Sequence, residues 1–314
     1  MGYHPRIEVS DIGCMTTSRT RNSELWFINN KAIQERILSR LAKYSTTREV
    51  KLYAFGIQGN HIHGLARYPK CNRADFKRDL NSSIATGVKK HVPTYTGGSL
   101  WARRYSVEFT PGDEDIEKEF FYIALQSVQD GLVDKISDYP GYNFFNDAVS
   151  GIKRKFKVVR WAEYNAKKRW DPGLSIKAYT EEFELVYQRL PGYERLSQAE
   201  YKKLMHRKLE EHRLAVLAAR GGKPCAGRAA LLAQRPGSRP KNTKTSTRFS
   251  HRPRILTDNG ERLAAGKEWY FGIYFRHRES SAKYRAGDLK VKFPPGTYKP
   301  PIFTCPAAYA ERYR

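Results

Sequence analysis

The sequence has few cysteines, few acidic residues and no long apolar run. The cysteines lie far apart and form no C-x-x-C pair, which argues against both a disulfide scaffold and a zinc ribbon. No stretch of 18 or more apolar residues occurs, so we expect no membrane-spanning helix and no membrane partner. The first residues lack the apolar segment of a signal peptide, and we therefore expect a cytoplasmic protein.

Basic residues are abundant instead. The 314 residues include 57 Lys and Arg but only 32 Asp and Glu, which gives a formal net charge of +25. A charge of this size indicates a polyanionic partner. An acidic membrane surface is the second candidate on charge alone, and nucleic acid is the first candidate and the partner that we predict. Hydrophobic residues make up 40% of the chain, which is enough for a packed core. These features favour a nucleoid-associated protein.

The first half of the chain alternates between strand and helix patterns. Short alternating or β-branched runs predict strands, and apolar residues spaced three or four apart predict helices. The expected order is a strand within 5–21, a helix at 30–44, strands at 50–57 and 61–68, a helix at 72–91, a strand at 105–109 and a helix from 113 to about 130. This order suits an α+β fold with an antiparallel sheet and helices on one face.

The second half differs in composition. Residues 1–150 form the first predicted domain, and residues 151–219 are interpreted as a helical extension. Residues 220–254 hold ten Lys or Arg and no Asp or Glu, which predicts a flexible basic linker. Residues 255–314 are predicted to form a small basic module with one or two helices and an extended tail.

His61 and His63 are the first candidates for chemistry. On a strand, residues two apart point to the same face, so both imidazoles project together while Ile62 points to the opposite face. Two adjacent imidazoles can bind one divalent metal ion. The alternative is a chance pair, because an H-x-H spacing is a short motif.

Tyr122 and Gln126 are the second pair of candidates. Residues four apart lie one turn apart on the same face of a helix, so a phenol and a carboxamide would face one cleft. The alternative is that Tyr122 is an ordinary core or boundary residue of an amphipathic helix.

The order of these motifs resembles the HUH endonucleases, and within them the single-tyrosine transposases of the insertion-sequence-200 type. The REP-associated tyrosine transposases are the most similar group. They carry Met-Pro-Asn-His-Val-His, then Tyr-Ile-x-x-Asn-Pro, followed by Gly-Leu-Val and Asp-Tyr-Pro. The matching segments here are QGNHIH at 58–63, YIALQ at 122–126, GLV at 131–133 and DYP at 138–140. Two departures stand out: Gln58-Gly59 replaces Met-Pro, and Gln126-Ser127 replaces Asn-Pro.

The resemblance implies a ferredoxin-like antiparallel sheet and a DNA-cleaving activity. Tyr122 would attack a phosphodiester of single-stranded or hairpin DNA and form a 5′-phosphotyrosine, from which the strand is rejoined. His61, His63 and Gln126 would hold the divalent metal, Mg²⁺ or Mn²⁺. The protein would act as a monomer or a homodimer. Gln126 keeps the amide oxygen that Asn supplies in the REP-associated group.

Four further residues are weaker candidates for DNA binding. Arg67 shares the face of His61 and His63 on an ideal strand, although an exposed strand arginine need have no such role. Trp101, Arg103 and Arg104 precede the strand at 105 and could stack on bases or neutralise phosphates, although a tryptophan is more often a core residue.

Two other functions remain open at this stage. The protein could be a domesticated transposase that binds DNA hairpins without cleaving them, although such a binder would not need His61, His63 and Tyr122 together. It could also be an RNA-binding module on a ferredoxin-like sheet, whose aromatic and basic strand pattern is not evident here. Rival nucleophiles are Tyr105, Tyr139 and Tyr142.

Overall fold

The central sheet forms where the sequence predicts strands. The computed structural model describes residues 4–240 and 254–301. Strands β1 (Gly13–Arg19), β2 (Lys51–Ile57), β3 (His61–Arg67) and β4 (Ser106–Thr110) are antiparallel and lie in the order β2-β3-β1-β4. This is the strand order of a ferredoxin-like sheet, with β3 and β1 in the centre. The predicted α+β fold is therefore confirmed.

The register sorts the side chains of the sheet onto two faces. Thr17 of β1 is paired with His63 of β3 and with Ser106 of β4. Because successive side chains of a strand point in opposite directions, these three residues share one face. Their neighbours Ser18 and Ile62 point to the other face. We call the side that carries His61 and His63 the histidine face.

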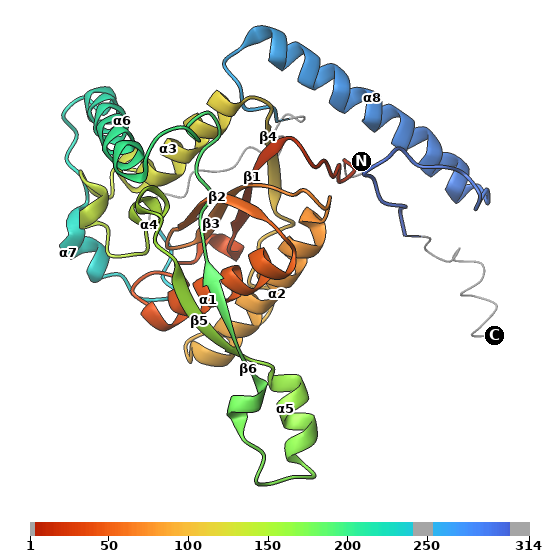
Figure 1. Cartoon of the computed structure of the whole chain (residues 1–314), viewed down its shortest axis with the longest axis horizontal. Helices are drawn as coiled ribbons and strands as arrows, with labels where there is room; N and C mark the ends of the chain where they lie inside the picture. The colour runs from red at the N-terminus through yellow and green to blue at the C-terminus, as the bar shows by residue number, and fades with distance from the viewer. Residues whose placement is uncertain (1–3, 241–253, 302–314) are drawn as a thin grey trace.

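Helices α1 (Lys31–Thr47) and α2 (Arg73–His91) cover the face opposite the histidine face. Asn81 Nδ2 of α2 donates a hydrogen bond to Ser18 Oγ of β1 (3.0 Å). The buried apolar residues of α1 recur at helical spacing: Ile33, Ile37, Leu38 and Leu41. These two helices lie side by side below the sheet in Figure 1.

Helix α3 (Asp113–Gln129) packs on the histidine face instead. Its Ile116 and Ile123 approach the sheet at glycines, since a Cβ on Gly13 would lie 2.9 Å from Ile116 Cδ1 and one on Gly56 would lie 2.9 Å from Ile123 Cγ2. This placement differs from the single helical face expected from the sequence. The physical reason is that the apolar stripe of α3 covers an apolar part of the histidine face.

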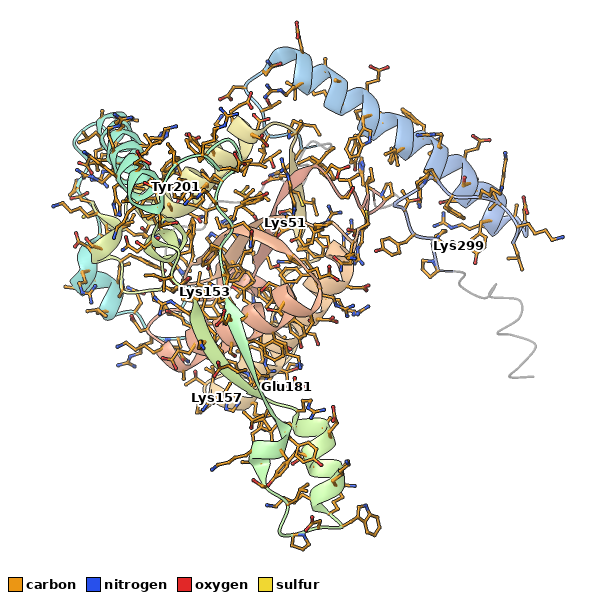
Figure 2. All side chains as sticks on the ribbon, viewed as in Figure 1. Lys51, Lys153, Lys157, Glu181, Tyr201 and Lys299 are labelled. Atoms are coloured by element: carbon orange, nitrogen blue, oxygen red, sulfur yellow. The ribbon has the colours of Figure 1, made fainter. Side chains whose placement is uncertain are left out.

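A two-stranded sheet follows, in a region that the sequence analysis interpreted as helical. Strand β5 (Arg154–Val159) pairs antiparallel with β6 (Thr180–Leu185). Apolar residues two apart on each strand, such as Phe156 and Val158, form the period-two pattern of strands that the helical interpretation overlooked. Figure 1 shows these strands extending away from the central sheet, and Figure 2 labels Lys157 and Glu181 on them.

The short helices of the chain join or flank these elements. They are η1 (Arg21–Ser23), η2 (Ile136–Asp138), α4 (Phe145–Ser150), α5 (Trp161–Lys168) and η3 (Ile176–Tyr179). Helices α5 and η3 lie between β5 and β6 in the chain, at the far end of the projection in Figure 1. The extension also returns to the central sheet, because Gln188 N donates to Leu52 O of β2 (2.7 Å).

Part of the expected basic linker is packed against the first domain. After α6 (Gln198–Ala219), the chain forms α7 (Gly227–Leu232). Asn29 Nδ2 donates to the carbonyl oxygen of Leu231 (2.8 Å), and Leu25 N donates to Ser238 O (2.8 Å). Backbone hydrogen bonds and the buried Leu231 explain why composition alone mispredicted residues 220–240. The remainder of the predicted linker, 241–253, lies outside the described residues.

The C-terminal segment attaches to the edge of the sheet. Phe109 N of β4 donates to Arg254 O (3.0 Å), and Leu256 N donates to Phe109 O (2.8 Å). Helix α8 (Gly260–Arg285) follows and extends along one side of the molecule (Figure 1). Within residues 4–240 and 254–301, no helix combines the length and apolar composition that a bilayer crossing requires.

Candidate active site

Two buried imidazoles lie next to each other on β3. The ring centroids of His61 and His63 are 4.8 Å apart, and each residue is 5% exposed. Burial lowers the pKa of His61 well below its usual range, with His63 and Arg19 contributing. Burial also lowers the pKa of His63 to about 3, with smaller effects from Arg19 and Lys77. Both rings are therefore neutral at physiological pH, which is the form that binds metal ions.

Hydrogen bonds set the orientation of both rings. Asn60 Nδ2 donates to Ser23 O (3.0 Å), which leaves Asn60 Oδ1 facing His61 Nδ1 at 2.6 Å. A carbonyl oxygen only accepts, so the proton of His61 is on Nδ1 and the lone pair is on Nε2. Thr17 Oγ1 lies 2.9 Å from His63 Nδ1. Outer contacts of this kind are typical of imidazoles that ligate metals through Nε2.

Helix α3 brings the amide of Gln126 to these rings. Gln126 is 5% exposed, and its Nε2 lies 2.7 Å from His61 Nε2. Gln126 Oε1 and His63 Nε2 are both buried without a hydrogen-bond partner. Buried polar atoms normally have partners, so these two atoms require an explanation.

The donor set fits a divalent cation. Two neutral imidazole nitrogens and an amide oxygen suit Mn²⁺, whereas Mg²⁺ prefers oxygen ligands more strongly. Among the residues that the structure describes, no group of three or more His, Cys, Asp or Glu could hold a metal ion. A site here therefore depends on the amide of Gln126 as the third ligand beside His61 and His63.

Tyr122 of α3 lies beside this pair of histidines. Its ring centroid is 6.2 Å from that of His63, and the residue is 38% exposed. Burial raises the pKa of the phenol, and the carboxylates of Asp130, Glu119 and Glu108 raise it further. Tyr122 is consequently protonated at neutral pH.

The three rival tyrosines, Tyr105, Tyr139 and Tyr142, are buried or hydrogen-bonded within the protein. Tyr139 Oη donates to Ile57 O (3.4 Å), and Tyr142 Oη donates to Asp147 Oδ2 (2.9 Å). Tyr105 is 7% exposed, and burial raises its pKa. The structure therefore brings Tyr122, and none of these three, to the predicted metal ligands with an accessible ring.

A groove of about 560 Å³ runs past Tyr122 and His63. Its basic lining residues are Arg19, Arg103, Arg104 and Arg254. The sequence analysis missed two of them. The alternation of β1 would have indicated Arg19, because it lies two residues after Thr17 on the histidine face. No local signal indicates Arg254, which reaches the groove only because its segment runs along β4.

Of the four weaker DNA-binding candidates, two line the Tyr122 groove and two do not. Arg103 and Arg104 line the groove. Arg67 Nη2 instead donates to Asp113 Oδ1 at the start of α3 (2.7 Å). Trp101 lies on the side of α2, where its Nε1 donates to Asn81 O (3.0 Å). Arg67 and Trp101 are therefore engaged within the protein, away from the Tyr122 groove.

Two buried carboxyl groups also lie near the groove and were missed in the sequence. Glu108 of β4 lines the groove and accepts a hydrogen bond from Arg254. Glu119 precedes Tyr122 by one helical turn and is 7% exposed. Burial raises the pKa of Glu119 to about 7, and the charge of Glu108 adds to this effect. The i, i+3 spacing between Glu119 and Tyr122 is the signal that could have identified it.

Residues 14–126 match the protein family described as "Transposase IS200 like". The matched segment begins in β1 and ends at Gln126, so it includes His61, His63 and Tyr122. This segment is an IS200-like transposase domain. The resemblance inferred from the two motifs is thus confirmed at the level of this family. No curated protein matches the chain.

Two solved structures are also similar to part of this chain. A REP-associated tyrosine transposase bound to a REP hairpin is 17% identical, with a TM-score of 0.41, over 47% of this chain and 85% of that chain. A candidate transposase from Deinococcus radiodurans is 17% identical, with a TM-score of 0.28, over 38% of this chain and 90% of that chain. Both likenesses leave more than half of this chain without a counterpart.

Proposed function

We propose that the transposase domain cleaves and rejoins single-stranded DNA through a covalent bond between Tyr122 and a 5′ phosphate. The proposal rests on one arrangement: the partly exposed Tyr122 lies beside two neutral imidazoles and near a buried amide oxygen, Gln126 Oε1, that has no hydrogen-bond partner. The arginines of the same groove supply positive charge for a DNA backbone. We expect the substrate to carry a hairpin, as the resemblance to the REP-associated group implies.

The proposed reaction balances without an energy source. Tyr122 Oη attacks the phosphorus, the bond from phosphorus to the 3′ oxygen breaks, and a 5′-phosphotyrosine forms. The phenol loses its proton, and the departing 3′ oxygen gains one. The 3′-hydroxyl of another strand can then attack the phosphotyrosine, which restores the phenol and joins the strands without ATP.

In this proposal, His61 Nε2, His63 Nε2 and Gln126 Oε1 would hold a divalent metal. A cation bound by these residues would supply Lewis-acid chemistry, polarising the scissile phosphate and stabilising the charge on it. Asn60 and Thr17 keep the Nε2 atoms turned away from the backbone by holding each Nδ1.

The test asks whether the protein forms a covalent adduct with DNA and whether the adduct requires Tyr122 Oη. Wild type and Tyr122→Phe are incubated with hairpin DNA labelled at its 3′ end and with Mn²⁺, then separated on a denaturing gel. A 5′-phosphotyrosine carries the label onto the protein, so we expect labelled wild type and no labelled Tyr122→Phe. Tyr105→Phe is the matched control, since it also loses one phenolic hydroxyl, and it should still form the adduct.

Two results would contradict the proposal. A wild-type level of adduct in Tyr122→Phe would move the nucleophile to another tyrosine. Tight binding of the hairpin by wild type without any adduct would favour the non-cleaving DNA-binding protein instead.

A further inference from the structure

A second groove lies on the other side of the transposase domain. It has a volume of about 360 Å³ and lies between α1, α2 and the start of α5. Its lining includes Arg36, Arg40 and Lys43 of α1 and hydroxyl residues of α2. Because α1 and α2 cover the face opposite the histidine face, this α1 groove and the Tyr122 groove belong to opposite sides of the sheet.

The cations of the α1 groove repel one another. Arg36, Arg40 and Lys43 stand at positions i, i+4 and i+7 and so form a stripe on one face of α1. Like charges at this spacing destabilise a helix. In agreement with this, burial lowers the pKa of Arg36, and the charge of Arg40 lowers it further. The stripe is therefore a cost to the folded protein unless an anion offsets it.

No such anion comes from the described part of the chain. Arg36 Nε and Arg40 Nε are buried and have no hydrogen-bond partner. Arg36 lies directly against Gly87 of α2, where a Cβ would be 2.6 Å from its Nε, so the close approach of the two helices depends on that glycine. Lys43 Nζ lies 5.8 Å from the ring centroid of Phe183 and has no carboxylate partner among the described residues.

The neighbouring Arg160 shows the contrast. It lies at the rim of the same groove and forms ion pairs with Glu163 (2.6 Å) and Glu181 (3.2 Å). Its charge is thus offset within the protein, while the charges of the α1 stripe are not. The excess positive charge of the groove belongs to Arg36, Arg40 and Lys43.

The composition of the groove selects phosphates over bases. Guanidinium, ammonium and hydroxyl groups are the side chains that contact DNA phosphates. From Arg36 to Lys43 the helix rises about 10 Å, and a DNA strand presents one phosphate per about 3.4 Å of axis, so the stripe spans about three phosphates. Proteins that hold single strands line their grooves with several aromatic rings on which the bases stack. In the lining of the α1 groove, Trp161 is the one aromatic residue.

We propose that the α1 groove is a second nucleic-acid site that binds the phosphate backbone of double-stranded DNA without regard to sequence. The protein would then hold a duplex on one side of its sheet and the reacting single strand on the other. This inference stands independently of cleavage at Tyr122, because it concerns binding alone.

The test uses a short, blunt DNA duplex as the probe. Its binding to the full-length chain is measured by fluorescence anisotropy over a range of salt concentrations. For Arg36→Glu/Arg40→Glu we expect at least about tenfold weaker binding and a log–log salt slope less steep by about 1.8, because each lost phosphate contact removes about 0.9. Arg36→Gln/Arg40→Gln should show a smaller change in the same direction. This variant removes the two charges without reversing them, so it still tests the proposal if the double Glu variant does not fold.

A matched control comes from α6. Lys203 and Arg207 are exposed on that helix with the same spacing, so Lys203→Glu/Arg207→Glu makes the same change in net charge away from the groove. The control should keep the wild-type salt slope. An equal loss in both variants would overturn the proposal, since only net charge would matter.

A second comparison separates the duplex from the single strand. The α1 variants should bind an unstructured single strand as wild type does, and should form the same amount of Tyr122 adduct with it. If single-strand binding falls as much as duplex binding, the groove does not select duplex DNA, and the proposal is overturned. Absence of adduct in wild type would contradict the proposed function. The duplex titration would still decide whether the α1 groove binds DNA.

Discussion

The two grooves of this protein have different chemistry although both are basic. The Tyr122 groove combines arginines with Tyr122, the buried imidazole of His63 and the buried carboxyl group of Glu108. His61 and Gln126 lie beside His63, behind this lining. The α1 groove has cations and hydroxyl groups, and its one acid, Glu163, is paired with Arg160. Charge alone can hold a phosphate backbone, but breaking a phosphodiester also requires a nucleophile and groups whose pKa values are shifted.

Net charge alone does not distinguish the two grooves. The formal charge of +25 indicates a polyanionic partner but does not say where it binds. In the proposed function the Tyr122 groove is the reactive one, because it contains a partly exposed tyrosine beside a buried imidazole and a buried carboxyl group.

Removing one imidazole should have the largest effect. We expect His63→Ala to lose detectable Mn²⁺ binding and adduct formation, because the cation would lose a ligand whose Nε2 has no other partner. Calorimetric titration with Mn²⁺ measures the binding, and thermal melting checks the fold. Arg36→Gln in the α1 groove is the control and should bind Mn²⁺ like wild type. Unchanged metal affinity in His63→Ala would remove the metal assignment.

Glu119 should make stability depend on pH. Its pKa of about 7 in the folded protein exceeds the usual glutamate value of about 4.5, so the carboxyl group loses its proton at a lower pH in the unfolded chain. Stability should therefore fall as pH rises from about 4.5 to about 7 and then level off, by at most about 3 kcal/mol, since one pKa unit is about 1.4 kcal/mol. The charged groups that face it are Glu108, Lys118, Asp115 and Asp258.

Glu119→Gln should remove this slope, because an amide keeps the shape of the neutral acid. Urea unfolding at several pH values compares the variant with wild type. The exposed Glu211→Gln on α6 is the matched control and should leave the slope in place. A wild-type pH slope in Glu119→Gln would show that another group causes it.

The support of His61 should have a smaller effect. We expect Asn60→Ala to weaken Mn²⁺ binding by about 10- to 100-fold, which is typical when an outer partner of a metal-binding histidine is lost. Without Asn60 Oδ1, the proton of His61 is no longer held on Nδ1. Calorimetry again provides the measurement. Unchanged affinity in Asn60→Ala would mean that α3 and Gln126 alone orient the ring.

The arginine from the C-terminal segment should have the smallest effect. We expect Arg254→Gln to weaken single-strand binding a few-fold and to flatten its salt slope by about 0.7, the value for one contact with a single strand. The matched change Arg285→Gln, near the end of α8, should leave the slope unchanged. Equal salt slopes in Arg254→Gln and wild type would remove Arg254 from the DNA path.

Much of the transposase domain could be predicted from local patterns. Alternation placed β2 and β3 within a residue or two of their observed bounds, and helical spacing did the same for α2. Helical spacing also placed the start of α1 within one residue, but α1 continues three residues past the predicted end at 44, to Thr47. The pair His61 and His63 needed only the period of a strand, and Tyr122 with Gln126 needed only the period of a helix. These are local properties, because they depend on backbone geometry over a few residues.

The meeting of the two motifs was decided by tertiary structure. Helix α3 crosses to the histidine face because Gly13 and Gly56 let Ile116 and Ile123 approach the sheet, and only this packing brings Gln126 to His61. In the same way, Arg254 reaches the Tyr122 groove through hydrogen bonds to Phe109 of β4. Local patterns in the sequence were enough to single out the candidate residues. Long-range packing decided which of them meet, because contacts between distant segments depend on the shape of the whole core rather than on local periodicity.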